Sequence, residues 1–211
     1  MSKVQFAGVN MAGFDFGCTI DGFCNLSNTL DIVTKGNALQ QMAHFTTETG
    51  LNTFRLPVAW QFLVNNVLGG NLDPTNFAAY NELVQGCLNT SAKVCIVDIH
   101  NYARFDGQII GQGGPANDVL VDLWTQLAMK YTNEPRIAFG VMNEPHDIPD
   151  IKVWAQTVQQ VVTAIRGTGA TKQLILMPGN NFTSAGAFVD NGSGGRLNLS
   201  RVTWAYGSDL T

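Results

Sequence analysis

The chain has 211 residues and a net charge of −4, and only 13% of its residues are charged, against roughly 25% in an average globular protein. The length can bury a sizeable core, which excludes disorder. The sequence has neither a cluster of lysine and arginine nor an apolar run of the ~18–20 residues that a membrane helix needs. We therefore expect a single domain over residues 1–211 with no nucleic-acid or membrane partner.

Five short and almost continuously apolar runs predict β-strands. They cover residues 4–9, 52–58, 93–100, 136–144 and 173–178. Runs of this kind are typical of parallel strands that are covered on both faces. Helical patterns occupy residues 37–49, 74–88, 117–131 and 151–166, with a further segment from about residue 184. Asp73 before Pro74 favours a helix start, and Gly50 favours a helix end.

The alternation of strands and helices indicates βαβ units around a parallel sheet. Polar residues stand at or just past the strand ends, namely Asn10, Arg55, Asp98, His100, Asn143, Glu144 and Asn180. Both a (β/α)8 barrel and a doubly wound sheet build ligand sites at this edge. The first turn, residues 13–17, is not a G-x-G-x-x-G phosphate loop, so we predict an α/β fold of the barrel type and no cofactor.

Glu144 is the most informative candidate for catalysis. It ends an apolar strand between Asn143 and Pro145, whereas the other three glutamates fall on or beside predicted helices. A carboxyl group that is partly shielded from water has a raised pKa and can donate a proton near neutral pH. Asn143 beside it can hydrogen-bond a sugar hydroxyl. The alternative is a strand-to-turn junction without chemistry.

Arg55 and His100 are candidates for supporting that chemistry. Arg55 is a cation that favours the ionised form of a neighbouring carboxylate, and a structural ion pair with Asp98 is an equally open interpretation. His100 lies two residues beyond Asp98, so both side chains point to the same side of the strand, and a structural hydrogen bond is its alternative role. Aromatic residues just past strand ends can stack on sugar rings or pack in the core, namely Trp60, Tyr102, Phe105 and Phe182.

The four cysteines form two closely spaced pairs. Cys18 and Cys24 are six residues apart, and Cys87 and Cys95 are eight apart. Neither spacing is a C-x-x-C motif, and the residues alone leave two local disulfides or four buried thiols open. No metal site is predicted. The first residues lead directly into a strand, so we expect a signal peptide to be absent from the chain or already removed.

Five ordered motifs carry a more specific resemblance. They are residues 8–10, 12–17, 54–58, 97–102 and 142–146, which read GVN, AGFDFG, FRLPV, VDIHNY and MNEPH. Together they resemble the fungal endo-β-1,4-glucanases (cellulases) of glycoside hydrolase family 5. The similarity continues through residues 68–73, 109–115 and 178–180, and so covers nearly the whole chain.

The resemblance implies a (β/α)8 barrel, secretion, and hydrolysis of a β-glucan with retention at the anomeric carbon. By motif position Glu144 matches the acid/base, and Arg55, His100 and Asn143 match residues that support the carboxylates and the substrate. The candidate substrate-binding residues are Asn10, Trp60, Asn101, Tyr102, His146, Asn180 and Phe182. The resemblance also favours the disulfides Cys18–Cys24 and Cys87–Cys95.

Half of the expected catalytic pair is missing. In this family the nucleophile is a glutamate at the end of the seventh strand, whereas this chain has no glutamate after Glu144 and contains about five of eight βα units. We interpret the chain as an endoglucanase truncated before the sixth strand, with little turnover of its own. A non-catalytic glucan-binding fragment is the alternative. If the chain is natively this short, its open sheet edges predict self-association. Asp98 is expected to lie deeper in the site than Glu144, as a partner that supports other side chains and not as the nucleophile.

Overall fold

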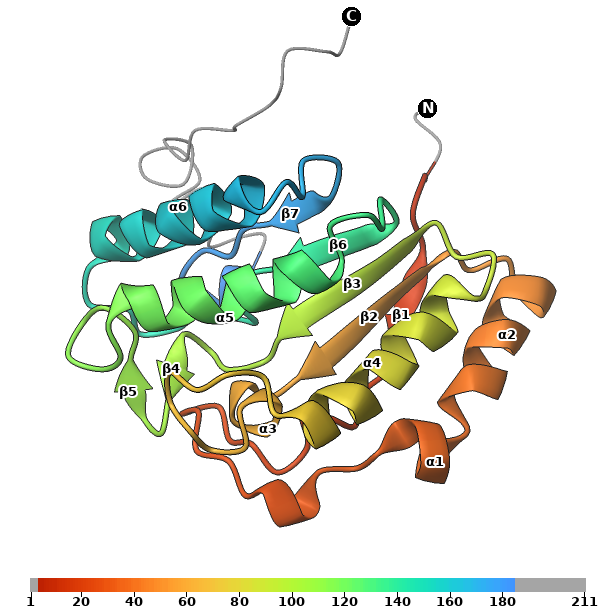
Figure 1. Ribbon diagram of the computed structural model, residues 1–211, viewed down its shortest axis with the longest axis horizontal. Helices are drawn as coiled ribbons and strands as arrows, with labels where there is room; N and C mark the ends of the chain where they lie inside the picture. The colour runs from red at the N-terminus through yellow and green to blue at the C-terminus, as the bar shows by residue number, and fades with distance from the viewer. Residues whose placement is uncertain (1–3, 185–211) are drawn as a thin grey trace, which may run out of the picture.

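A parallel β-sheet forms the centre of the protein in the computed structural model, which describes residues 4–184 (Figure 1). Its five strands are β1 (Gly8–Asn10), β2 (Thr53–Val58), β3 (Val94–Ile99), β6 (Ile137–Gly140) and β7 (Leu174–Leu176), in the order β1-β2-β3-β6-β7. Within this sheet each strand pairs in parallel with the next one along the chain. A doubly wound sheet reverses its strand order at a switch point, so the observed order supports the predicted barrel winding.

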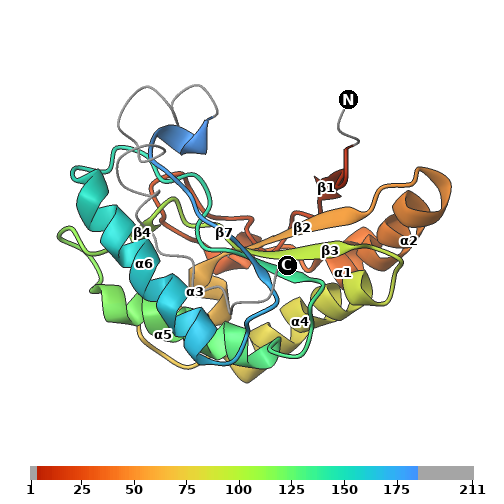
Figure 2. The same cartoon turned by 90° about the horizontal axis from the view of Figure 1, so that it is seen from above.

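The long helices gather on one side of the sheet (Figure 2). They are α2 (Ala38–Glu48), α4 (Pro74–Leu88), α5 (Asn117–Lys130) and α6 (Ile151–Gly167), close to the predicted ranges. The sequence patterns do not predict the shorter elements, which are α1 (Ile32–Gly36), α3 (Trp60–Leu63), η1 (Leu26–Asn28), η2 (Asn181–Thr183) and the hairpin of β4 (Arg104–Phe105) and β5 (Gln108–Ile109). These elements are too short to show a hydrophobic period. The helix predicted from about residue 184 lies outside the described residues.

Local signals in the sequence explain where the helices begin and end. Asp73 Oδ1 accepts hydrogen bonds from the backbone nitrogens of Thr75 at 3.0 Å and Asn76 at 2.9 Å, so α4 begins where predicted. Gly50 follows α2 with a φ of +73°, a conformation that a glycine adopts without strain. Within residues 4–184, no helix has the length and apolar character needed to cross a membrane.

The side chains of the strands alternate between two faces. On β2, Phe54 and Leu56 are fully buried against the helices, while Arg55 between them faces the other side, which we call the inner face. The sequence predicted that both faces of the sheet are covered. Among the described residues only the face toward the helices is covered, since Leu174 and Leu176 of β7 are each 46% exposed. A barrel interior is filled by strands from all round it, so five strands leave this face partly open. Self-association through the sheet edges stays a prediction.

Two disulfides tie local segments together. Cys18 is bonded to Cys24 in the loop after β1, and Cys87 at the end of α4 is bonded to Cys95 on β3. The structure therefore confirms the pairing that the resemblance favoured, and the alternative of four free thiols is wrong.

Replacing Cys87 and Cys95 together by alanine is expected to lower the free energy of unfolding by about 2–3 kcal/mol. The bond closes a short loop, and its loss restores conformational freedom to the unfolded chain. Chemical denaturation followed by circular dichroism measures the change. The parent protein in a strong reductant serves as the control and should lose at least as much. An unchanged denaturation midpoint in the double variant would contradict a stabilising role for this bond.

Candidate active site

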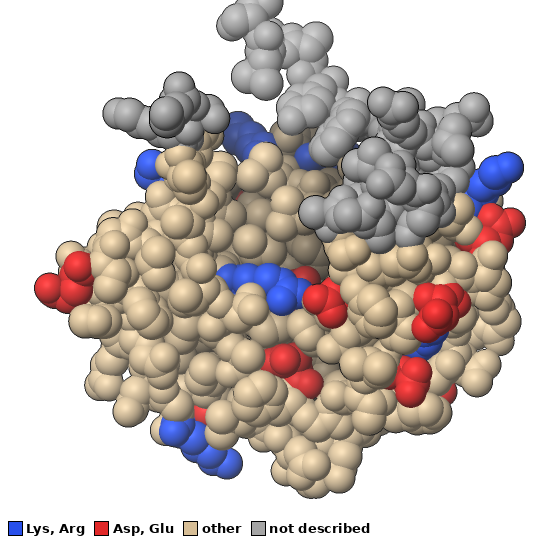
Figure 3. Space-filling model, turned by 180° about the vertical axis from the view of Figure 1, so that it is seen from behind, with Lys and Arg blue, Asp and Glu red and all other residues tan. Residues whose placement is uncertain are grey.

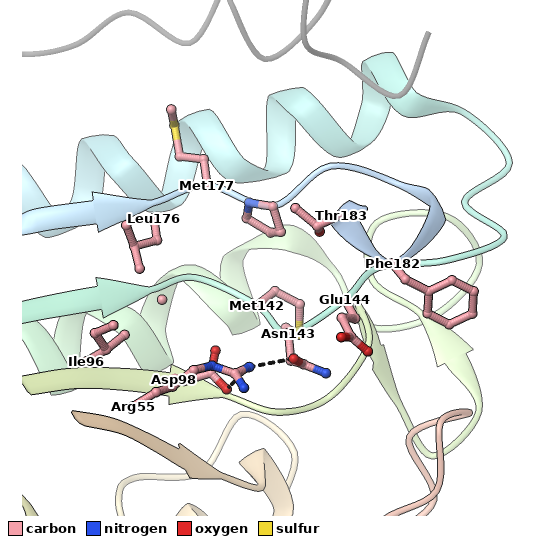
Figure 4. A pocket seen from close by; sticks show the side chains of 12 residues that line it. Arg55, Ile96, Asp98, Met142, Asn143, Glu144, Leu176, Met177, Phe182 and Thr183 are labelled. Carbon is pink, nitrogen blue, oxygen red and sulfur yellow. Dashed lines mark hydrogen bonds and ion pairs between the residues drawn. The ribbon is translucent and has the colours of Figure 1, made fainter. Parts of the chain in front are cut away.

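The carboxyl ends of the strands line a pocket on the inner face of the sheet (Figure 4). Arg55 from β2, Asp98 from β3, Asn143 and Glu144 after β6, and Phe182 from η2 all line it. The space-filling view from behind shows basic and acidic side chains side by side next to a hollow, on a face that is otherwise mostly uncharged (Figure 3). The fold therefore brings residues that are far apart in the sequence to one place.

Arg55 is the common partner in a hydrogen-bond network that joins three strands. Its Nη2 donates to Asp98 Oδ2 at 2.7 Å and to Asn143 Oδ1, and its Nη1 reaches Asn10 Oδ1 at 3.4 Å. Asp98 Oδ2 also lies 3.0 Å from His100 Nδ1. The Asp98 side chain is 5% exposed, against 27% for Arg55. The structure thus shows the ion pair that the sequence left open for Arg55, and Asp98 lies deep as expected.

Backbone contacts beyond the end of β6 hold Asn143 and Glu144. The nitrogen of Asn143 donates to the carbonyl of Ile99 at the end of β3, at 2.7 Å. Glu144 has a φ of +38°, a region that non-glycine residues rarely adopt and that is typical of functional sites. Asn143 is buried, and its Nδ2 has no hydrogen-bond partner among residues 4–184. Because Arg55 can only donate, it bonds to the acceptor Oδ1 of Asn143, and the donor Nδ2 of Asn143 stays without a partner among these residues.

The carboxylate of Glu144 is open to solvent. Glu144 is exposed, so the expected shielding from water is wrong for the described residues. It also belongs to no metal cluster, since residues 4–184 contain no group of three His, Cys, Asp or Glu side chains arranged to hold an ion. Burial raises the pKa of the nearby Tyr102, and the charge of Glu144 raises it further, so the Tyr102 hydroxyl keeps its proton. That hydroxyl lies 3.4 Å from His100 Nε2.

Phe182 presents an aromatic ring at the edge of the pocket. The ring is 47% exposed and stacks on His146, with centroids 4.7 Å apart and an interplanar angle of 14°. His146 is buried, and its two nitrogens lie 2.7 Å from Asp147 Oδ2 and 3.0 Å from the carbonyl of Ile20. His146 therefore supports the Phe182 ring, and its direct contact with substrate stays a prediction. Asn180 accepts a hydrogen bond from the loop after β6, and its substrate contact stays a prediction.

Other predicted sugar-binding residues are buried away from the pocket. Trp60 is 1% exposed and packs edge-on against Phe105, with ring centroids 5.1 Å apart. Asn101 accepts from the backbone nitrogen of Trp60 at 2.7 Å and donates to Gln61 Oε1. The structure therefore shows the packing alternative for Trp60 and Phe105, and sugar contacts of Trp60 and Asn101 stay a prediction. Gln61 completes this buried network, and no signal in its apolar surroundings indicates that role.

The consecutive parallel βα units, with a polar pocket at their carboxyl ends, define a protein of the (β/α)-barrel class. A family model described as "Cellulase (glycosyl hydrolase family 5)" matches residues 9–200. The chain belongs to this family.

Named relatives agree with this assignment. Endoglucanase EG-II of Hypocrea jecorina is 57% identical over 214 residues, which cover 98% of this chain and 50% of that protein. The crystal structure of Cel5A (EG2) from the same organism superposes with a TM-score of 0.89 at 57% identity, over 95% of this chain and 62% of that one. XacCel5A in complex with cellopentaose gives a TM-score of 0.79 at 28% identity, with coverage of 95% and 62%. The chain spans about half the length of the curated relatives it matches.

Proposed function

We propose that the pocket binds a β-1,4-glucan and that Glu144 is the general acid of its hydrolysis. One observation carries this proposal: the exposed carboxylate of Glu144 stands next to Asn143, whose buried Nδ2 is an unused donor aimed away from Arg55. A buried amide without a partner is costly, and a sugar hydroxyl that accepts from it removes that cost. The similarity to named endoglucanases supports the choice of substrate.

The chemistry proposed for Glu144 is proton transfer. In its neutral form it donates a proton to the glycosidic oxygen as the bond to the anomeric carbon breaks, and as a carboxylate it later takes a proton from the attacking water. Retention needs a second carboxylate about 5–5.5 Å away that bonds to the anomeric carbon. Asp98 also lines the pocket, but it is buried and held by Arg55 and His100, so we do not assign it that role.

Two side chains are placed to contact the sugar units. The exposed face of Phe182, backed by His146, offers a surface on which a pyranose ring can stack. The protonated hydroxyl of Tyr102 can donate to a sugar oxygen or to His100. We also infer that the protein is secreted, because its two disulfides belong to an oxidising compartment.

A second candidate function is glucan binding without hydrolysis. The observation in its favour is that, of the two carboxylates lining the pocket among residues 4–184, Asp98 is engaged in an ion pair and Glu144 alone is open to a ligand. The two candidates share the binding step and differ in the chemical step.

Replacing Glu144 by glutamine separates the two candidates. For a catalytic Glu144, we expect cellotetraose binding by calorimetry to change by less than about threefold. The slow hydrolysis of cellotetraose expected of a chain without an assigned nucleophile should fall at least about 100-fold, because the amide cannot transfer the proton. Glu82→Gln, at an exposed position on α4, is the matched control and should change neither quantity. Binding by both proteins with no hydrolysis by the parent would favour the second candidate. No binding by the parent would overturn both.

A further inference from the structure

Asp98 is the residue of the Arg55 network whose carboxylate is almost fully buried. It pairs in register with Gly140 of β6, and a Cβ at Gly140 would lie 3.1 Å from Asp98 Oδ1, so the neighbouring glycine makes room for the carboxylate. Its Oδ2 receives both Arg55 Nη2 and His100 Nδ1, at 2.7 Å and 3.0 Å. One buried oxygen therefore holds two side chains, of which Arg55 lines the pocket.

The hydrogen count at Arg55 decides which nitrogen of His100 carries a proton. The terminal nitrogen Nη2 has two hydrogens, and these are used by Asp98 Oδ2 and Asn143 Oδ1. None is left for His100 Nδ1, which lies 3.4 Å from Nη2. Because Asp98 is an acceptor, Nδ1 must be the donor in their contact, and Nε2 of the neutral ring is left as an acceptor facing the Tyr102 hydroxyl.

We propose that Asp98 is the positioning residue that sets the direction of hydrogen bonding in this site. It holds His100 in the Nδ1–H tautomer, and through Arg55 it turns Asn143 so that Nδ2 faces away as a donor. The network thus ends in one acceptor, His100 Nε2, and one buried donor, Asn143 Nδ2. The meaning of this pattern for a sugar rests on the proposed function, whereas the tautomer itself does not.

Asp98→Leu is the direct test, because it keeps a similar size and removes the oxygen that accepts from both Arg55 and His100. One hydrogen of Arg55 Nη2 is then free for His100 Nδ1, which lies 3.4 Å away, and the ring is driven to the Nε2–H tautomer. Nitrogen-15 spectra of histidine-labelled protein at about pH 8, where imidazoles are largely neutral, distinguish the two tautomers. The signal of His100 among the three histidines is identified by its loss in His100→Gln. Asp118→Asn, at an exposed position on α5, is the matched control.

The expected result is Nδ1–H in the parent and in Asp118→Asn, and Nε2–H in Asp98→Leu. An Nε2–H signal in the parent overturns the proposal without any variant. Retention of Nδ1–H in a folded Asp98→Leu also overturns it, because the tautomer would then not depend on the Asp98 oxygen. Cellotetraose binding should weaken about tenfold in Asp98→Leu, as one hydrogen bond is lost. If the parent binds no cellotetraose, the proposed function fails while the tautomer result stands.

A second variant keeps the test available if Asp98→Leu does not fold. Gly140→Ala crowds Asp98 Oδ1 and shifts the carboxylate by a few tenths of an ångström. The Nδ1–H proton of His100 should then exchange faster and resonate further upfield than in the parent. Gly167→Ala, where nothing lies within 4 Å of the added Cβ, is the control and should leave that signal unchanged. An unchanged signal in Gly140→Ala would contradict the proposal.

Discussion

Replacing Trp124 by alanine is expected to lower the free energy of unfolding by about 3–5 kcal/mol. Trp124 on α5 is fully buried and packs edge-on against Phe139 of β6, with ring centroids 5.7 Å apart. Its Nε1 donates to the carbonyl of Val141 at 3.0 Å. The variant loses the packing and leaves that buried carbonyl without its partner. Chemical denaturation monitored by far-ultraviolet circular dichroism measures the change.

Two controls separate packing from the hydrogen bond. Trp124→Phe keeps most of the buried ring and should lose only about 1–2 kcal/mol, chiefly from the unpaired Val141 carbonyl. Met129→Ala on the same helix removes a side chain that is 60% exposed, and should change the stability by less than about 0.5 kcal/mol. A Trp124→Ala variant as stable as Met129→Ala would contradict the packing of α5 on the sheet.

Replacing Arg55 by methionine is expected to lower the free energy of unfolding by about 3–5 kcal/mol at neutral pH. The variant leaves the nearly buried Asp98 carboxylate without its cation, and breaking one side of a buried pair costs more than the pair contributes. Chemical denaturation of both proteins at neutral pH measures the difference.

Arg55→Lys is the matched variant for this experiment. It keeps the positive charge. Its ammonium nitrogen is tetrahedral, however, and lacks the fixed planar geometry with which Arg55 Nη2 donates to Asp98 and Asn143 together. We expect it to recover more than half of the stability lost in Arg55→Met. A stability loss below about 1 kcal/mol in Arg55→Met would contradict the view that the variant leaves a buried Asp98 carboxylate unpaired.

Much of the fold could be predicted from the sequence, because its signals are local. The apolar runs at residues 52–58 and 93–100 contain β2 and β3, since a continuous run of such residues can be buried only as a strand or a buried helix segment, and these runs are short. Asp73 and Pro74 mark the start of α4, because the aspartate accepts from free backbone nitrogens and the proline has none to satisfy.

The candidate site could be predicted only in part. The period of two along a strand is enough to place Asp98 and His100 on one face. Arg55 lies within β2 and not at its end as expected, and it reaches Asp98 from there. The burial of Trp60 and the exposure of Glu144 could not be predicted in the same way. Each depends on loops that fold over the strand ends, such as the hairpin of β4 and β5 that carries Phe105.

The sequence by itself determined the order of strands and helices, the polar edge of the sheet and the motifs of the family, because periodicity, capping and motif spacing are properties of neighbouring residues. Only the tertiary structure decided which polar groups at that edge are already paired. Asp98 is paired with Arg55 and His100, whereas Asn143 Nδ2 has no partner among the described residues. The physical reason is that a hydrogen bond requires its two atoms within about 3 Å. For Arg55 and Asn143, which are 88 residues apart, folding alone provides that contact.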